Sequence, residues 1–393
     1  MKTLAGRLSL LAPSLTIAMT ALAAEMKAKG KDIISLTAGE PDFDTPDFIK
    51  QAATDALKNG KTKYTGTAGD PALIDAVRAK FKNENSLDYG KDEVCVTSGA
   101  KHAIYNALLA LAEPGDEVLV PVPYWVTYPE LVKFLGGKPV FVAPKPENGF
   151  KITGDDINRA VTKKTKALVL NTPCNPSGAV YTKKELSDIA EAVVRNDLYL
   201  VSDEVYEHIT AEGRVHVSPA SLPGMRERTF VINGVSKAFA MTGWRIGYMA
   251  GPAALIKPVV AMQGQTTHHA STPAMAAAAV ALTSPEGPAF IRTLNKAFDE
   301  RRAFMVEALN NIPGLCCALP EGAFYCFPDA SALYKNGITG SMDLSQRLLD
   351  TTGVATVPGI AFGDDRHVRL SCAANLDNLK KAASRLNEGI PRL

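Results

Sequence analysis

A lysine, a serine and an arginine lie close together after the short apolar run Phe230–Ile232. Lys237 follows Ser236 directly, and Arg245 comes eight residues after the lysine. A neutral lysine amine is both a nucleophile and a base, and its pKa falls readily in a partly desolvated, cationic site. An arginine guanidinium binds anions through a planar fork of donors. A lone lysine after a strand is usually a solvated loop residue, but these three residues together predict amine chemistry beside a bound anion.

Further polar residues follow two other apolar runs. Asp203 and Tyr206 come after Leu198–Val201, where the carboxylate by itself could simply cap the next helix. Asn175 lies in the segment Asn171–Gly178, where by itself it could be a turn residue before a proline. Ligands of parallel sheets bind outside the carboxyl ends of the strands, so we expect these side chains to share one site.

A phosphate site is predicted where the run Val94–Val96 ends. The segment Thr97–Lys101, with Gly99 at its centre, opens the helical pattern His102–Leu111. Backbone N–H groups at the start of a helix bind phosphate well, although such turns between strand and helix are common.

Together these segments resemble the class I aminotransferases of fold type I, which depend on pyridoxal phosphate, and among them the prokaryotic-type aspartate aminotransferases. The resemblance extends from Ser35–Phe43 to Arg369–Ser371, nearly the whole chain. It implies a ping-pong transfer of an amino group between an L-amino acid, with aspartate preferred, and 2-oxoglutarate. It also implies a homodimer whose active sites are shared between subunits.

The resemblance assigns three catalytic residues. Lys237 would bond the aldehyde of the cofactor and then move a proton between the substrate α-carbon and C4′ of the cofactor. Asp203 would pair with the pyridinium nitrogen and keep it protonated. Tyr206 would hydrogen-bond the phenolic O3′, and Asn175 would do so from the opposite side.

The resemblance also implies the remaining contacts. Trp125, which could otherwise be a core residue, would stack on the cofactor ring. The α-carboxylate of the substrate would lie against Arg369 and Gly39, beside Trp125 and Asn175, and Lys101 would lie near a distal carboxylate. No metal is expected. The cofactor phosphate would be bound by Gly99, Ala100, Lys101, Ser236, Arg245 and, from the neighbouring subunit, Tyr64.

Four residues depart from the subgroup pattern. Ala12 stands where some members carry a basic residue linked to prephenate, which argues against that substrate here. His268 and His269 replace residues of a serine-rich stretch that approaches the active site of the partner. They could be surface or packing residues, or one could bind an unusual substrate or confer pH dependence. His102 replaces a common glutamine and makes the chemistry of the pocket less predictable.

Two other activities remain open at this stage. The same cofactor site could serve aromatic, small or other non-dicarboxylic amino acids, or β-elimination at a C–S bond, because a fold does not determine one reaction. A non-catalytic cofactor-binding protein is disfavoured, because no active-site position is missing.

These residues require a sheet to position them, and six apolar runs rich in β-branched residues predict its strands. Helical patterns between the runs, such as Lys183–Arg195 with Thr182 as N-cap, complete the βαβ pattern. The fold class is therefore α/β, and the resemblance implies a mainly parallel, seven-stranded sheet flanked by helices. The predicted strands are Val94–Val96, Val118–Val120, Pro139–Val142, Ala167–Leu170, Leu198–Val201 and Phe230–Ile232.

The chain of 393 residues predicts two domains. We assign residues 45–282 to a large, cofactor-binding domain, and residues 1–44 with 283–393 to a smaller α+β domain. In the second, the pattern predicts a long helix over Phe290–Leu309 and strands near Ala323–Phe327 and His367–Cys372.

Composition excludes several classes of protein. The formal net charge of +2 is too small for non-specific binding to nucleic acid or anionic membranes, and we expect neither partner. Six cysteines without a C-x-x-C pair suit reduced thiols in the cytoplasm. The uncharged stretch Leu8–Ala24 resembles a signal peptide, but polar residues interrupt it, and a retained amphipathic helix is the better interpretation. Its apolar stripe would be Ile17, Ala21, Ala24 and Ala28.

Overall fold

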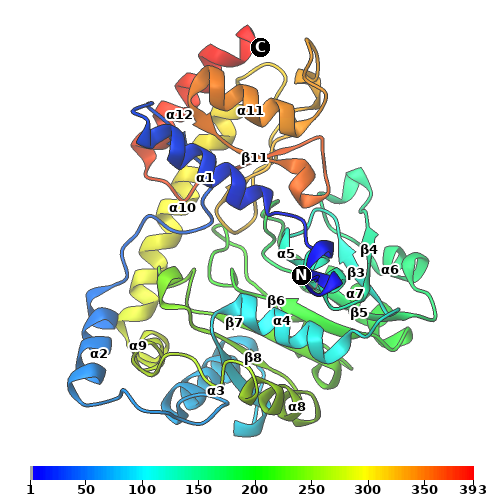
Figure 1. The fold of residues 1–393 in the computed structure, drawn as a ribbon, viewed down its shortest axis with the longest axis vertical. Helices are drawn as coiled ribbons and strands as arrows, with labels where there is room; N and C mark the ends of the chain where they lie inside the picture. Colours follow the sequence, from blue (N-terminus) through cyan, green and yellow to red (C-terminus); the bar gives the residue numbers. More distant parts are fainter. Residues whose placement is uncertain (1–2) are drawn as a thin grey trace.

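The computed structural model describes residues 3–393, which form two packed parts (Figure 1). One is built around a large sheet and carries the first described residues on its surface, and the other contains the C-terminus. The α-helices are α1 (Leu15–Ala28), α2 (Asp47–Lys58), α3 (Pro71–Asn85), α4 (Ala100–Leu111), α5 (Thr127–Phe134), α6 (Gly154–Ala160), α7 (Lys183–Arg195), α8 (Ala253–Gly264), α9 (Thr272–Thr283), α10 (Glu286–Asn310), α11 (Ser341–Thr352) and α12 (Leu376–Gly389).

The large sheet has seven strands in the order β2-β8-β7-β6-β5-β3-β4. Only β8 runs antiparallel to its neighbours, so the carboxyl ends of the other six strands meet at one edge. The predicted mainly parallel sheet and its six strands are confirmed, and β8, which has no β-branched residue, is the strand that the pattern missed. The strands are β2 (Val94–Thr97), β3 (Glu117–Pro121), β4 (Lys138–Val142), β5 (Thr165–Asn171), β6 (Tyr199–Asp203), β7 (Thr229–Gly234) and β8 (Gly247–Ala250).

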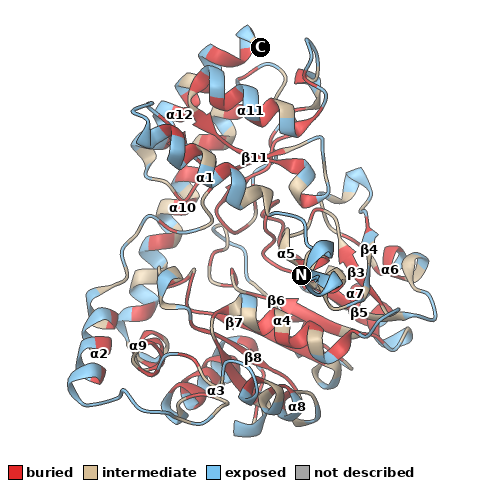
Figure 2. Cartoon of the chain, in the orientation of Figure 1, coloured by how far each residue is buried: buried red, intermediate tan, exposed pale blue. Residues whose placement is uncertain are grey.

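Both faces of this sheet are covered, which explains why its strands are almost continuously apolar. In β6, Val201 packs with α4, α5 and α8, whereas its neighbour Leu200 packs with α6 and α7. In β7, Phe230 faces the first of these cores, and Val231 faces a third core with α2, α3 and α9. Figure 2 shows the strands among the most buried parts of the chain.

The second part combines a segment near the N-terminus with the C-terminal segment in one core. Ile34 and Leu36 pack there with residues of α11 and α12. α10 passes from one part to the other (Figure 1): Phe290 packs against the large-sheet core, and Met305 lies in the second core. The domain boundaries of the sequence analysis stay a prediction. The short strands are β1 (Ile34–Ser35), β9 (Tyr325–Cys326), β10 (Val354–Ala355), β11 (Val357–Pro358) and β12 (Val368–Ser371).

The helix predicted near the N-terminus exists as α1, but its predicted apolar stripe was wrong. Ile17, Ala21, Ala24 and Ala28 are exposed, and α1 instead buries Met19, Ala23 and Met26. The helix is apolar on several sides, so the spacing of its apolar residues does not show which face is buried. Packing against Leu349 and Ala355 determines that face. Within residues 3–393, no helix is long and apolar enough to cross a membrane.

Candidate active site

A cavity of about 330 Å³ opens at the carboxyl edge of the large sheet. Parallel strands end there, and side chains from the second part close the opposite side. It contains eleven of the residues predicted for the site: Gly39, Ala100, Lys101, Trp125, Asn175, Asp203, Tyr206, Ser236, Lys237, Arg245 and Arg369.

Lys237 is partly buried in this cavity, shortly after the end of β7. Its Nζ donates a hydrogen bond of 2.5 Å to the carbonyl oxygen of Gly39. The pKa of Lys237 is lowered to about 8, mainly by burial; Glu40 opposes this effect, and the charges of Arg245 and Arg369 add to it. At slightly alkaline pH much of the amine is therefore neutral and able to act as nucleophile and base.

Asp203 is buried at the end of β6. Its Oδ2 accepts a hydrogen bond of 2.5 Å from the hydroxyl of Tyr128, and its Oδ1 accepts one from the Val205 N–H at 3.3 Å. Burial raises the pKa of Asp203 to about 6, although these two hydrogen bonds favour the charged form. A cation placed directly beside this carboxylate would stabilise its charged form.

The neighbouring loop after β5 carries Asn175. The side-chain amide of Asn171 donates to the Asp203 carbonyl oxygen at 2.9 Å, and its Oδ1 accepts from the Asn175 N–H at 2.8 Å. Asn175 in turn accepts a hydrogen bond of 2.9 Å from Nη1 of Arg369. This chain of hydrogen bonds fixes the position of the Arg369 side chain relative to the ends of β5 and β6.

Arg369 lies almost completely buried in β12, with 2% of its surface exposed. Its Nη2 donates to the Thr37 carbonyl oxygen at 2.7 Å. Within residues 3–393, its buried Nε has no hydrogen-bond partner. A guanidinium buried with an unused donor at a cavity is suited to binding a carboxylate.

The other end of the cavity is shaped for an anion. Gly99 ends the turn before α4 at φ 84°, and a Cβ there would stand 2.4 Å from Nη2 of Arg245. A side chain at this position would therefore displace the guanidinium. The first N–H groups of α4, the Arg245 guanidinium and the Ser236 hydroxyl together can hold a phosphate.

The remaining wall combines a cation with apolar surface. The Lys101 ammonium lies 4.9 Å from the ring centre of Trp125. Ile17, in the first turn of α1, also lines the cavity although 66% of its surface is exposed.

Tyr64 is the predicted site residue that lies apart from this cavity. Tyr64 is 87% exposed, and the centre of its ring lies 5.4 Å from that of His268 and 5.7 Å from that of His269. The two histidines also hold the loop after Tyr64: His268 Nδ1 is bonded to the Thr67 hydroxyl at 3.0 Å, and His269 Nε2 accepts from the Thr65 N–H at 3.3 Å.

The other departures from the subgroup pattern have local contacts. His102 lies outside the lining of the cavity, and its Nδ1 accepts from the Ser98 N–H at 3.2 Å, in the turn that precedes α4. The backbone N–H of Ala12 donates to Glu130 at 2.7 Å, beside a neighbouring hollow that also reaches Lys101.

Two tyrosines of the site were not predicted. Tyr128 contacts Asp203, and Tyr325 contacts Tyr206 through a hydroxyl pair 2.8 Å apart. Tyr128 follows Trp125 by three residues at the start of a helix, a spacing that could have pointed to it. Tyr325 lies in a short strand of the distant second part, and no local signal marks it.

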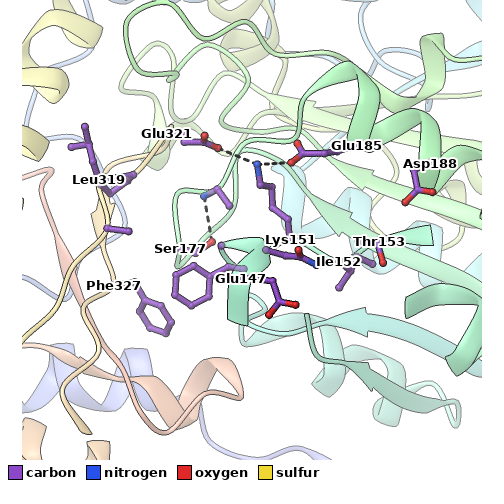
Figure 3. A pocket seen from close by; sticks show the side chains of 16 residues that line it. Glu147, Lys151, Ile152, Thr153, Ser177, Glu185, Asp188, Leu319, Glu321 and Phe327 are labelled. Carbon is purple, nitrogen blue, oxygen red and sulfur yellow. Dashed lines mark hydrogen bonds and ion pairs between the residues drawn. The ribbon is translucent and has the colours of Figure 1, made fainter. Parts of the chain in front are cut away.

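A larger cavity of about 510 Å³ shares no lining residue with the site. Its ammonium group, that of Lys151, is already paired with Glu185 at 2.8 Å and Glu321 at 3.6 Å, as Figure 3 shows. These charges satisfy one another, and no arrangement of nucleophile and base is present among its lining residues.

Glutamates and histidines also cluster behind the site, at Glu84, Glu207 and His208 and at Glu204, Glu207 and His216. Glu207 is common to both groups, but its carboxylate is already paired with Lys80 and accepts hydrogen bonds from Asn85 and Asn233. These contacts leave little capacity for a metal ion.

The site of this α/β fold combines a nucleophilic amine, a buried carboxylate, a phosphate-binding turn and an arginine with an unused hydrogen-bond donor. These groups define an enzyme that acts on small anionic molecules bearing amino groups. The family model described as "Aminotransferase class I and II" matches residues 31–386, and the chain belongs to this family.

Similar proteins extend over the full length of the chain. A probable aspartate/prephenate aminotransferase of Thermus aquaticus is 46% identical over 99% of this chain and 100% of its own. The crystal structure of the aspartate aminotransferase of Rhizobium meliloti matches with a TM-score of 0.96 and 42% identity over 100% of both chains. That of Thermus thermophilus with maleate has a TM-score of 0.94 and 45% identity, over 99% of this chain and 100% of the other.

Gly99→Ala tests the anion cradle. We expect the variant to lose the thermal stabilisation that millimolar inorganic phosphate gives the unmodified protein, because the new methyl group displaces Arg245. Gly60→Ala is the matched control, since Gly60 also has a positive φ, 73°, but open space around its Cα. Equal stabilisation of Gly99→Ala and the control by phosphate would show that the cradle does not bind the anion.

Proposed function

We propose that this protein is a pyridoxal-phosphate-dependent aminotransferase that exchanges amino groups between aspartate and 2-oxoglutarate. One observation carries the proposal: Lys237, Asp203, Arg245 and Arg369 line a single cavity at the carboxyl edge of the sheet. The full-length similarity to aspartate aminotransferases supports the same reaction.

The chemistry of the residues fits this cofactor. Gly99, Ala100, Ser236 and Arg245 would hold its phosphate, and Trp125 would face its ring. Asp203 would pair with the ring nitrogen, and a protonated nitrogen there would balance a buried carboxylate that has no other cation in direct contact within residues 3–393. Tyr206 and Asn175 would hydrogen-bond the phenolic oxygen. The pocket therefore offers a complement to each polar group of the cofactor.

When bound, the cofactor supplies an aldehyde that takes up the amino group and a ring that accepts the electron pair of the substrate α-carbon. The protein contributes the acid–base steps and the positioning. The Lys237 amine would remove the proton from the substrate α-carbon and deliver it to C4′ of the cofactor. Its pKa of about 8 suits both the basic and the acidic step. The carboxylate of Asp203 keeps the ring nitrogen protonated and thereby strengthens the electron sink.

Arg369 and Lys101 support an acidic substrate. The unused Nε of Arg369 and its neighbouring N–H groups would bind the α-carboxylate in a bidentate manner, with Gly39 and Asn175 beside it. Lys101, at the open wall, would meet a distal carboxylate. The related Thermus thermophilus enzyme was solved with maleate, a dicarboxylate. Ala12 offers no positive charge, so we expect prephenate to be a poor substrate.

A homodimer with shared active sites is part of the proposal. The strongly exposed ring of Tyr64, in tilted contact with His268 and edge-on contact with His269, would extend from one subunit toward the cofactor phosphate of the other. The histidines would then act through the position of this loop.

Lys237→Ala should abolish transamination while the protein stays folded, because the variant lacks the amine proposed for both the nucleophilic and the proton-transfer steps. Lys101, the other amine of the cavity, lies against Trp125 and cannot replace Lys237 at the carbonyl oxygen of Gly39, so we expect kcat to fall by at least about a thousandfold. A coupled assay of oxaloacetate formation measures this, with circular dichroism as the check on folding and the exposed Lys184→Ala as control. Appreciable turnover by Lys237→Ala would contradict the assignment.

Arg369→Lys keeps the positive charge but loses the planar fork, so KM should rise for every amino-acid substrate. Loss of one charge-assisted hydrogen bond predicts about a tenfold to hundredfold increase. Arg226→Lys, which alters an arginine paired with Glu93 away from the cavity, should leave KM unchanged. An unaltered KM in Arg369→Lys would remove this arginine from the α-carboxylate site.

The substrate class is tested by adding single amino acids, without an acceptor, to the cofactor-loaded protein and following its visible absorbance. Aspartate and glutamate should react fastest, and Lys101→Met should slow these two more than it slows alanine and phenylalanine. Fast reaction with aromatic or small amino acids alone would keep the mechanism but reject the dicarboxylate preference. Release of pyruvate and ammonia from cysteine-type substrates would instead indicate a C–S lyase.

A further inference from the structure

Tyr325 connects the second part of the molecule to the chemistry at the large sheet. It is fully buried in β9, which pairs with β12 so that Tyr325 lies opposite Ser371. Its side chain lines the active-site cavity, and its hydroxyl lies 2.8 Å from that of Tyr206. Within residues 3–393, the Tyr206 hydroxyl makes no other hydrogen bond.

Gly39 is shaped around the same hydroxyl. A Cβ at Gly39 would stand 2.7 Å from the Tyr325 hydroxyl oxygen, so a side chain at position 39 would occupy the space of this phenol. The carbonyl oxygen of Gly39 is also the acceptor of the Lys237 amine. The Tyr325 hydroxyl is therefore held between Tyr206 and the backbone that contacts Lys237.

The ring of Tyr325 has a second contact. The Arg369 guanidinium carbon lies 4.5 Å from its centre, and the ring of Phe362 contacts the same guanidinium at 5.0 Å. A cation over an aromatic face is attracted to it, most strongly when water is excluded. One side chain thus touches the arginine proposed for the substrate carboxylate and the tyrosine proposed for the phenolic oxygen of the cofactor.

The hydroxyl pair has a direction when the site is loaded. A phenol has one proton to donate, so Tyr206 can donate to the cofactor only if its own oxygen becomes the acceptor of its neighbour. Tyr325 has the proton to give. Successive hydrogen bonds polarise one another, and the second donor strengthens the first.

We propose that Tyr325 is a positioning residue for the transamination: its hydroxyl donates to Tyr206, which strengthens the hydrogen bond from Tyr206 to the phenolic oxygen, and its ring orients Arg369. This inference rests on the proposed function and adds a residue to it. The two roles are separable, because Tyr325→Phe removes the hydroxyl and keeps the ring, whereas Tyr325→Leu removes both.

The test is a pH titration of the visible absorbance of the protein loaded with pyridoxal phosphate. A donor to the phenolic oxygen stabilises the negative charge that this oxygen carries in the deprotonated form of the bound cofactor. Tyr325→Phe should therefore raise the midpoint by about half a unit to one unit. kcat should fall, while KM for aspartate stays within about twofold because the ring still contacts Arg369. Tyr325→Leu should also raise KM.

A double-mutant cycle separates this role from ordinary packing. In a Tyr206→Phe background, Tyr325→Phe should cause no further shift, because its effect passes through Tyr206. Tyr89→Phe, which removes a hydroxyl from another buried tyrosine away from the site, should leave the midpoint unchanged. Gly39→Ala tests the same contact from the other side, since its Cβ would displace the hydroxyl, and should raise the midpoint as well.

The outcomes distinguish the two proposals. Absence of a pH-dependent visible band in the unmodified protein would overturn the proposed function. A normal titration in the unmodified protein with the same midpoint in Tyr325→Phe, or equal shifts in the presence and absence of the Tyr206 hydroxyl, would overturn the role of Tyr325 alone.

Discussion

Removing the amine of Lys237 from water is the constraint on which the rest of the site depends. Desolvation disfavours the charged ammonium, and the two nearby arginines act in the same direction, so the pKa falls to about 8. This environment needs walls from distant parts of the chain: the Gly39 carbonyl from the N-terminal segment, Tyr206 after β6 and Arg369 from β12. The two parts of the molecule must therefore pack together before the lysine acquires its chemistry.

Two acidic residues four positions apart show how strongly packing decides charge. Burial raises the pKa of Asp203 to about 6. Burial would also raise that of Glu207, but the adjacent ammonium of Lys80 overcomes it and holds the pKa at about 2. The end of β6 thus directs Asp203 toward the cavity, and the loop after it directs Glu207 toward α3. The charge of Asp203 can therefore be stabilised by a cation in the cavity, whereas Glu207 is already paired with Lys80 and bonded to Asn233 of β7.

Much of the fold and site could be predicted from local patterns. Apolar runs such as Phe230–Ile232 predict strands because both faces of the sheet are buried, and the chemistry-bearing residues follow those strands directly. Prediction failed where local patterns were ambiguous. The apolar stripe of α1 was assigned to the wrong face, and β8 lacks the β-branched residues that mark a strand.

The amino-acid sequence by itself determined the order of most strands and helices, because this order depends on periodicity along the chain. Its motifs also determined the family resemblance, which in turn pointed to Lys237, Asp203 and Arg369. Only the tertiary structure decided which groups share the cavity. The contact between Tyr206 and Tyr325 joins residues 119 positions apart, and that between Asn175 and Arg369 joins residues 194 apart. Such pairs leave no local signal, since their partners meet only when the two parts of the molecule bury their apolar cores against each other.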